Sequence, residues 1–185
     1  MTLIFYTIIG IITFIAFLHA AAKKEFDISR TVVINCSKEE VFNLVRQLKK
    51  QHLWMPWFAG NYKGILKYKG DDGKTDALLY WKGHKRFYEG TQKITKIQQG
   101  KIIETKFSIV KPFRMVLLEY KGLKEIDDNK TKMVWGVRGY LAFPFSVLSL
   151  IQPVDKAYGK ELELGLKNLK TSLEAKHIPK EVKAL

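Results

Sequence analysis

The chain has 185 residues, and its 32 basic and 18 acidic side chains leave a formal net charge of +14 at pH 7. This length suits one domain with a single core, and the presence of only one cysteine excludes a fold held by internal disulfide bonds. The sequence contains no phosphate-loop, dinucleotide-binding, nucleophile-elbow or zinc-protease motif, and its four histidines are widely separated. We therefore expect no metal site and no cofactor.

The most distinctive segment is residues 3–22, which contain no Asp, Glu, Lys or Arg. A helix of this length, at ~1.5 Å per residue, spans about 30 Å, which is the thickness of the hydrocarbon layer of a bilayer. Charge resumes directly afterwards with Lys23 and Lys24. We interpret residues 1–22 as an N-terminal transmembrane anchor.

Two alternatives remain for this segment, a cleaved signal peptide and a buried helix of the domain. The small residues Ala20 and Ala22 offer a signal-cleavage site, but the first residues lack the positive charge of a signal peptide. Lys23, Lys24 and Arg30 follow the segment and no basic residue precedes it, so the positive-inside rule places the remaining chain in the cytoplasm. Signal cleavage would instead give a secreted or periplasmic protein.

The whole charge of the chain lies after this segment, in a domain that we delimit at residues 23–176, with a flexible tail at 177–185. The basic residues are mostly lysines, which act as solvated point charges, and they form no continuous block. Direct base readout favours arginine. We therefore expect the domain to associate with a membrane surface and not with nucleic acid, and the oligomeric state stays open.

The first elements of the domain are predicted to be a strand and a short helix. Residues 26–35 are rich in β-branched side chains, which is typical of a strand. Ser37 and Glu40 then form the spacing of a capping box, and apolar residues follow at helical intervals up to Leu48. Pro56 limits any helix in the aromatic segment 54–58, where we expect a short helix or turn.

A series of strands follows, separated by short turns. Turn residues occupy positions 70–73 and 127–129, and Pro112 interrupts the run between them. Short turns favour an antiparallel meander. The expected strands are residues 62–69, 74–81, 87–98, 101–110, 114–124 and 130–140.

The last predicted element is a long helix over residues 154–174. Its apolar stripe consists of Ala157, Leu162, Leu166, Leu169 and Leu173. Gly159 and Gly165 lower its helix propensity, and a helical glycine is tolerated where something packs closely against the backbone. The element order predicts an α+β fold in which a curved antiparallel sheet of about seven strands wraps around this helix. Such an arrangement leaves space for an apolar ligand between sheet and helix.

Four local patterns resemble the SRPBCC superfamily of START and Bet v 1-like proteins, in its polyketide cyclase/dehydrase-like branch. They are the S-K-E-E-V-F segment at 37–42, W-M-P-W at 54–57, M-V-W-G at 133–136 followed by F-P-F at 143–145, and G-L-K-N-L-K at 165–170. The resemblance covers nearly all of residues 26–174. It implies a helix-grip fold with an internal cavity, and it implies no shared catalytic residues.

Our leading hypothesis is a membrane-tethered protein that binds a hydrophobic or amphipathic small molecule, such as a lipid, in this cavity. The candidates for the cavity wall are the apolar residues Trp57, Leu78, Tyr80, Phe107, Leu117, Met133, Trp135 and Val137. Strand alternation places the side chains of Met133, Trp135 and Val137 on one face. The anchor makes this a less diffusible protein than a soluble ligand carrier.

Two alternatives belong to other classes. An enzyme acting on an apolar substrate needs a titratable group in a partly desolvated pocket, and the polar candidates are Glu104, Glu119 and Arg138, with a buried glutamate facing the arginine. A non-enzymatic regulatory or stress-response protein would instead dock a partner at the membrane, with Trp54 and Trp57 at the contact surface.

Overall fold

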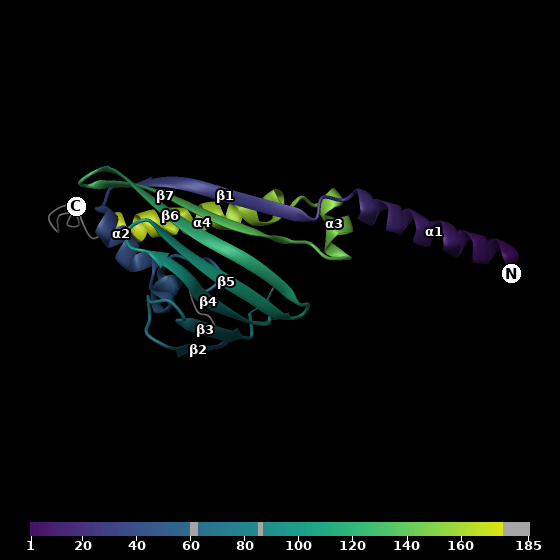
Figure 1. Cartoon of the computed structure of the whole chain (residues 1–185), viewed down its shortest axis with the longest axis horizontal. Helices are drawn as coiled ribbons and strands as arrows, with labels where there is room; N and C mark the ends of the chain where they lie inside the picture. Colours follow the sequence, from purple (N-terminus) through teal and green to yellow (C-terminus); the bar gives the residue numbers. More distant parts are fainter. Residues whose placement is uncertain (60–62, 85–86, 176–185) are drawn as a thin grey trace, which may run out of the picture.

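The computed structural model describes residues 1–59, 63–84 and 87–175, and it contains a helix-and-sheet domain preceded by one long helix (Figure 1). Within the described residues, seven antiparallel strands form one sheet in the order β1-β7-β6-β5-β4-β3-β2. The expected α+β class and strand number are therefore confirmed. The strands are β1 (Glu25–Ile34), β2 (Ile65–Lys69), β3 (Leu78–Lys82), β4 (Glu89–Gln98), β5 (Ile102–Lys111), β6 (Met115–Asp127) and β7 (Lys130–Tyr140).

Two short helices, α2 (Lys38–Val45) and the 3₁₀ helix η1 (Leu48–Leu53), connect β1 to the distant edge of the sheet. The Ser37 hydroxyl accepts a bond from the backbone N–H of Glu40, which is the predicted N-terminal cap. Val41, Phe42, Leu44 and Val45 are buried, so α2 presents its apolar side to the core.

The long helix α4 (Val154–Glu174) lies along the sheet and contacts β1 and β7. Leu162, Leu166, Leu169 and Leu173 are buried on its inner side, as their spacing predicts. Arg30 of β1 binds this helix from outside, because its guanidinium donates to the carboxylates of Asp155 and Glu163. The sheet and α4 thus enclose one core.

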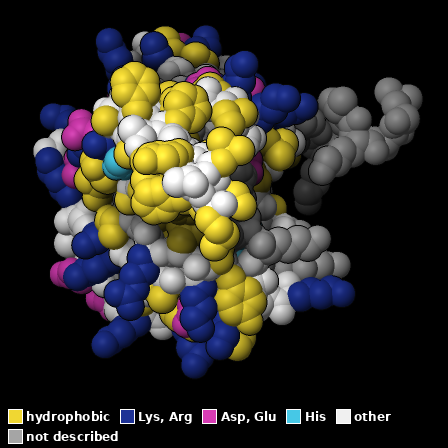
Figure 2. Space-filling view, turned by 90° about the vertical axis from the view of Figure 1, so that its right-hand side faces the viewer, with side chains coloured by type: hydrophobic (Ala, Val, Ile, Leu, Met, Phe, Trp, Pro, Cys, Tyr) yellow, Lys and Arg dark blue, Asp and Glu magenta, His cyan; other side chains and the backbone are white. Residues whose placement is uncertain are grey.

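The helices α1 (Thr2–Ala21) and α3 (Phe145–Ile151) meet at one end of the domain, and α1 projects away from it (Figure 1). No residue of α1, all of which the structure describes, is buried, and this 20-residue helix is long and apolar enough to cross a membrane. The alternative of a buried domain helix is therefore wrong. Seen from this end, hydrophobic side chains gather at the centre of the face and Lys and Arg side chains surround them (Figure 2).

Two strand predictions differ from the structure. The expected strand 74–81 is reduced to β3, because residues 70–77 form a longer connection in which Asp76 has a positive φ of 70°. The expected strand 62–69 is seen as β2, and the beginning of that prediction lies outside the described residues, as does the tail at 177–185.

Candidate ligand pocket

A pocket of about 240 Å³ lies between the sheet and the first half of α4, and α3 closes it toward α1. The sheet contributes side chains from β1, β5, β6 and β7, and the segment after η1 contributes Trp57. The helical side includes Phe145, Leu148 and Ser149 of α3, and Val154, Ala157, Tyr158 and Leu162 of α4. Three separate parts of the chain therefore have to fold together before the pocket exists.

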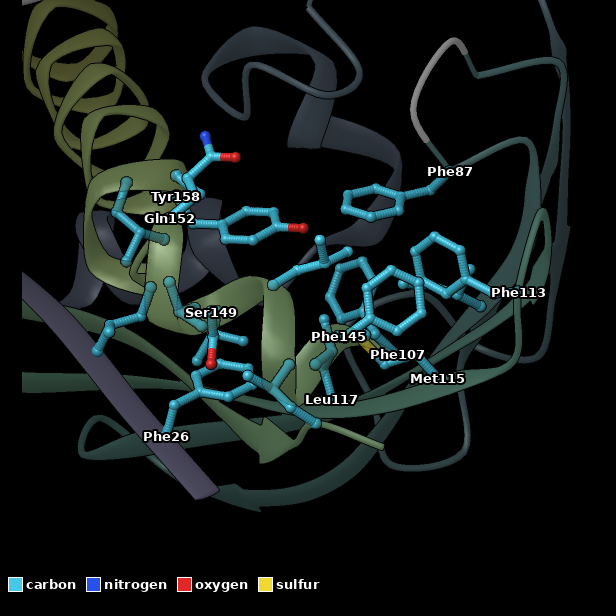
Figure 3. Close-up of a pocket in the computed structure, with 18 of the residues that line it drawn as sticks. Phe26, Phe87, Phe107, Phe113, Met115, Leu117, Phe145, Ser149, Gln152 and Tyr158 are labelled. Carbon is cyan, nitrogen blue, oxygen red and sulfur yellow. The ribbon is translucent and has the colours of Figure 1, made fainter. Parts of the chain in front are cut away.

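Seven of the 19 described residues that line the pocket are aromatic, and Figure 3 shows several of their rings converging on the same space. The rings of Phe113 and Phe145 lie 4.2 Å apart and join the β5–β6 turn to α3. Those of Phe87 and Tyr158 are nearly parallel, with centroids 6.2 Å apart. Such ring pairs give a stiff apolar wall, since each aromatic has only two side-chain torsions and packs through a large area.

Trp57 is held in the pocket wall by contacts on both sides. Its indole N–H donates to the Glu161 carboxylate of α4, and its ring meets Phe107 edge to face at 5.8 Å. One end of the indole is thus bonded to a charged group while the ring faces the apolar space. This is the arrangement expected for a tryptophan at a boundary between polar and apolar surroundings.

Few polar groups reach the pocket. The polar side chains of its lining are Ser149, Gln152 and Tyr158, and the Ser149 hydroxyl donates to the backbone carbonyl of Ser146 at 2.7 Å. Among the described lining residues there is no Asp, Glu, His, Lys or Arg. The wall is therefore suited to binding by shape and apolar contact.

The structure divides the eight apolar candidates into two groups. Trp57, Phe107, Leu117 and Val137 line the pocket, whereas Met133 and Trp135 are buried deeper in the core and do not line it. The remaining two, Leu78 and Tyr80, are misplaced, because β3 directs Leu79 and Trp81 into the core instead.

Tyr80 lies on the side of β3 away from the core, where it has a different partner. Its hydroxyl donates to the Glu89 carboxylate at 2.8 Å. This hydrogen bond holds the pKa of Glu89 below its ordinary value, and Lys111 and Lys82 act in the same direction.

The polar candidates do not form one site. Glu104 is partly exposed, with its carboxylate 4.0 Å from the ammonium of Lys96. Arg138 is exposed. Its register partners on the two neighbouring strands are Asp27 and Leu118, so its side chain does not face a buried glutamate. The expected Glu–Arg pair is therefore wrong.

Glu119 is buried, as the enzyme hypothesis requires, but its charged partner is Lys121 of the same strand, with Nζ 2.6 Å from Oε2. The same carboxylate also accepts bonds from Gln92, Thr105 and the indole N–H of Trp135, the last at 2.6 Å. No described member of this buried polar cluster lines the pocket, and the ring of Trp135 lies 5.9 Å from that of Trp57, which does.

Several residues that line the pocket were not predicted from the sequence, above all Phe26, Phe113, Phe145 and Tyr158. Phe145 lies in the F-P-F segment that carries part of the resemblance, and the apolar stretch after it was visible. The sequence pattern alone does not predict which side of α3 faces the sheet. The orientation of α3 depends on the β5–β6 turn, because Phe145 packs against Phe113 of that turn.

No protein-family model matches the sequence, and no curated protein is similar to it in sequence. Solved structures are similar in fold. Norcoclaurine synthase from Thalictrum flavum has a TM-score of 0.60 at 9% identity, over 89% of this chain and 94% of that protein. XoxI from Bacillus cereus has a TM-score of 0.57 at 15% identity, over 83% and 99%. The Aha1 protein from Colwellia psychrerythraea has a TM-score of 0.56 at 13% identity, over 80% and 96%.

The chain has a Bet v 1-like fold. At these identities the likeness concerns the fold alone, because proteins with the same fold carry many functions. In this Bet v 1-like domain the pocket occupies the part of the space between sheet and helix that lies next to α3.

Proposed function

We propose that the protein binds a small apolar or amphipathic molecule in the pocket between the sheet and α4, while α1 tethers the domain to a membrane. The observation that carries the proposal is the pocket wall itself. It combines a mostly apolar lining, rich in aromatic rings, with three polar side chains, which is the composition of a small-molecule site. The fold neighbours support a cavity in this place without indicating its ligand.

The size of the pocket limits the ligand. Its volume of about 240 Å³ lies just below the range of ~300–1,000 Å³ that is usual for small-molecule sites. The occupant is therefore either a compact molecule or the apolar part of a longer one, such as a lipid chain whose polar end remains outside. The Tyr158 hydroxyl and the Gln152 amide are the groups that would orient such a polar end.

The tether is supported by α1, which is apolar throughout and exposes its side chains. Lys23 and Lys24 directly after it favour a retained helix with the domain on the cytoplasmic side. A cleaved signal peptide is the competing interpretation, and the mass of the mature protein distinguishes the two.

An enzyme of the cyclase or dehydratase type is the alternative in another class. It requires a group at the pocket that moves a proton. Glu119 is a buried carboxylate, but both its oxygens accept hydrogen bonds and it does not line the pocket. We therefore place binding ahead of catalysis.

The proposal is tested by native mass spectrometry of the full chain released from detergent micelles after incubation with lauric acid or 2-naphthol. One adduct per chain is expected. Ala157 lines the pocket, so Ala157→Phe fills it and should weaken the adduct about tenfold or more, a loss of ~1.4 kcal/mol of binding free energy. Leu164→Phe, on the exposed side of the same helix, is the matched control and should bind as the wild type does. Equal adducts for all three proteins, or none for any, would overturn the proposal.

A further inference from the structure

Helix α3 stands between the pocket and the end of α1. Phe145, Leu148 and Ser149 turn toward the pocket. On the other side, the Ser146 hydroxyl lies 2.6 Å from Nδ1 of His19, in the last turn of α1, and the ring of Phe143 meets the His19 ring at 5.8 Å. The pocket wall and the apolar helix are thus in direct contact.

Exposed apolar side chains surround this contact. Three large apolar side chains in and just before α3 are exposed: Phe143 by 57%, Leu150 by 49% and Ile151 by 84%. Leu148, which also lines the pocket, is half exposed and marks its mouth together with the exposed Gln152. Monomeric soluble domains seldom expose such a cluster unless it contacts a partner or a membrane.

Basic residues flank the same end of the domain. Lys23 lies two residues after the end of α1. Lys111 ends β5, and Arg114 lies in the β5–β6 turn that packs on α3 through Phe113. Lys156 lies in the first turn of α4, just after α3. Figure 2 views this end of the molecule with α1 nearest the viewer, and Lys and Arg side chains surround the hydrophobic centre. This is the charge pattern of a surface that meets anionic headgroups.

We propose that α3 and the β5–β6 turn dock onto the surface of an anionic bilayer beside α1, so that the mouth of the pocket opens at the lipid headgroups. Because α3 contacts the last turn of α1, a membrane that contains α1 has its surface at the level of α3. The docking rests on the α1 tether of the proposed function and not on its ligand. The further consequence, that ligand exchanges between pocket and bilayer past Leu148, rests on the proposed function.

The docking is tested with the full chain in vesicles, using a label on α3. The only cysteine, Cys36, is buried and is replaced by Cys36→Ala. A single new cysteine at Leu150→Cys carries an environment-sensitive fluorophore, and Ile126→Cys, equally exposed in the distant β6–β7 hairpin, is the matched control. Vesicles are phosphatidylcholine alone or mixed with phosphatidylglycerol, with or without brominated lipid as quencher.

The label at position 150 is expected to shift to shorter wavelength and to be quenched by brominated lipid, more strongly with phosphatidylglycerol present, whereas the label at position 126 stays in water. Lys111→Glu with Arg114→Glu should reduce the shift without changing the lauric acid adduct measured in detergent. A label at position 150 that stays in water in both vesicles would overturn the proposal. Shielding only in native membranes, and not in protein-free vesicles, would assign the face to a protein partner and overturn it as well.

The two proposals fail separately. Docking without any adduct would leave a membrane-facing domain with no ligand and would contradict the proposed function only. An adduct that Ala157→Phe abolishes, in a protein whose α3 label stays in water, would keep the binding site and remove the membrane-facing mouth.

Discussion

The ammonium of Lys121 lies 2.6 Å from the carboxylate of Glu119 inside the domain, and no more than 1% of either side chain is exposed. The two residues are separated by one position on β6, so both side chains point to the inner face of the sheet. A buried charge is costly unless it is paired and hydrogen-bonded. The Glu119–Lys121 pair is therefore a point where one substitution has a large effect.

We predict that Lys121→Met destabilises the protein by ~3 kcal/mol or more, because it leaves the Glu119 charge without its counterion. The double variant Glu119→Gln with Lys121→Met removes both charges and should be more stable than the single variant. Chemical denaturation of the full chain in detergent measures both. Equal stability of wild type and Lys121→Met would show that the pair contributes nothing.

A second prediction concerns the two glycines of α4. A Cβ at Gly165 would overlap the Trp135 ring and meet Pro56 at 3.0 Å, whereas a Cβ at Gly159 would meet the end of the long Arg30 side chain, which can shift, and lie 3.4 Å from a carboxylate oxygen of Asp155. Gly165→Ala should therefore destabilise the protein despite the gain of ~1 kcal/mol in helix propensity. Gly159→Ala is the control and should be close to neutral. Thermal unfolding compares the two, and a stabilised Gly165→Ala variant would contradict the observed packing of α4 on Trp135.

The third prediction concerns pH. The Arg30 guanidinium bonds Asp155 and holds the pKa of that carboxyl below its ordinary value of 3.8, so the unfolded chain takes up the proton first as pH falls. The stability from this pair is therefore fully present above the ordinary pKa and is lost as pH falls through the lowered pKa of the folded state. Arg30→Ala should be less stable than wild type at neutral pH.

The stability difference between wild type and Arg30→Ala should shrink steadily as the pH is lowered below about 4. Denaturation series at several pH values measure it. A difference that stays constant across the acid range would assign the effect of Arg30 to packing against Gly159 instead of to its charge.

Local patterns in the sequence determined the order of the elements. The capping residues Ser37 and Glu40, the apolar stripe of α4 and the turn residues 127–129 all act within a few positions of the chain, so they can be recognised without tertiary structure. The close packing predicted for the helical glycines was likewise correct, because Gly159 faces Arg30 and Gly165 faces Trp135. The apolar character of α1 also follows from composition alone.

Only the tertiary structure decided which side chains share the pocket. Which side chains of β3 face the core depends on the connection around Asp76. Side chains alternate between the two faces of a strand, so a shift by one residue would put Leu78 and Tyr80 in the core in place of Leu79 and Trp81. The partner of Glu119 and the position of Phe145 depend on contacts between segments far apart in the chain. Sequence periodicity says that a side chain is buried, but the direction of each strand and the packing of α3 decide what it is buried against.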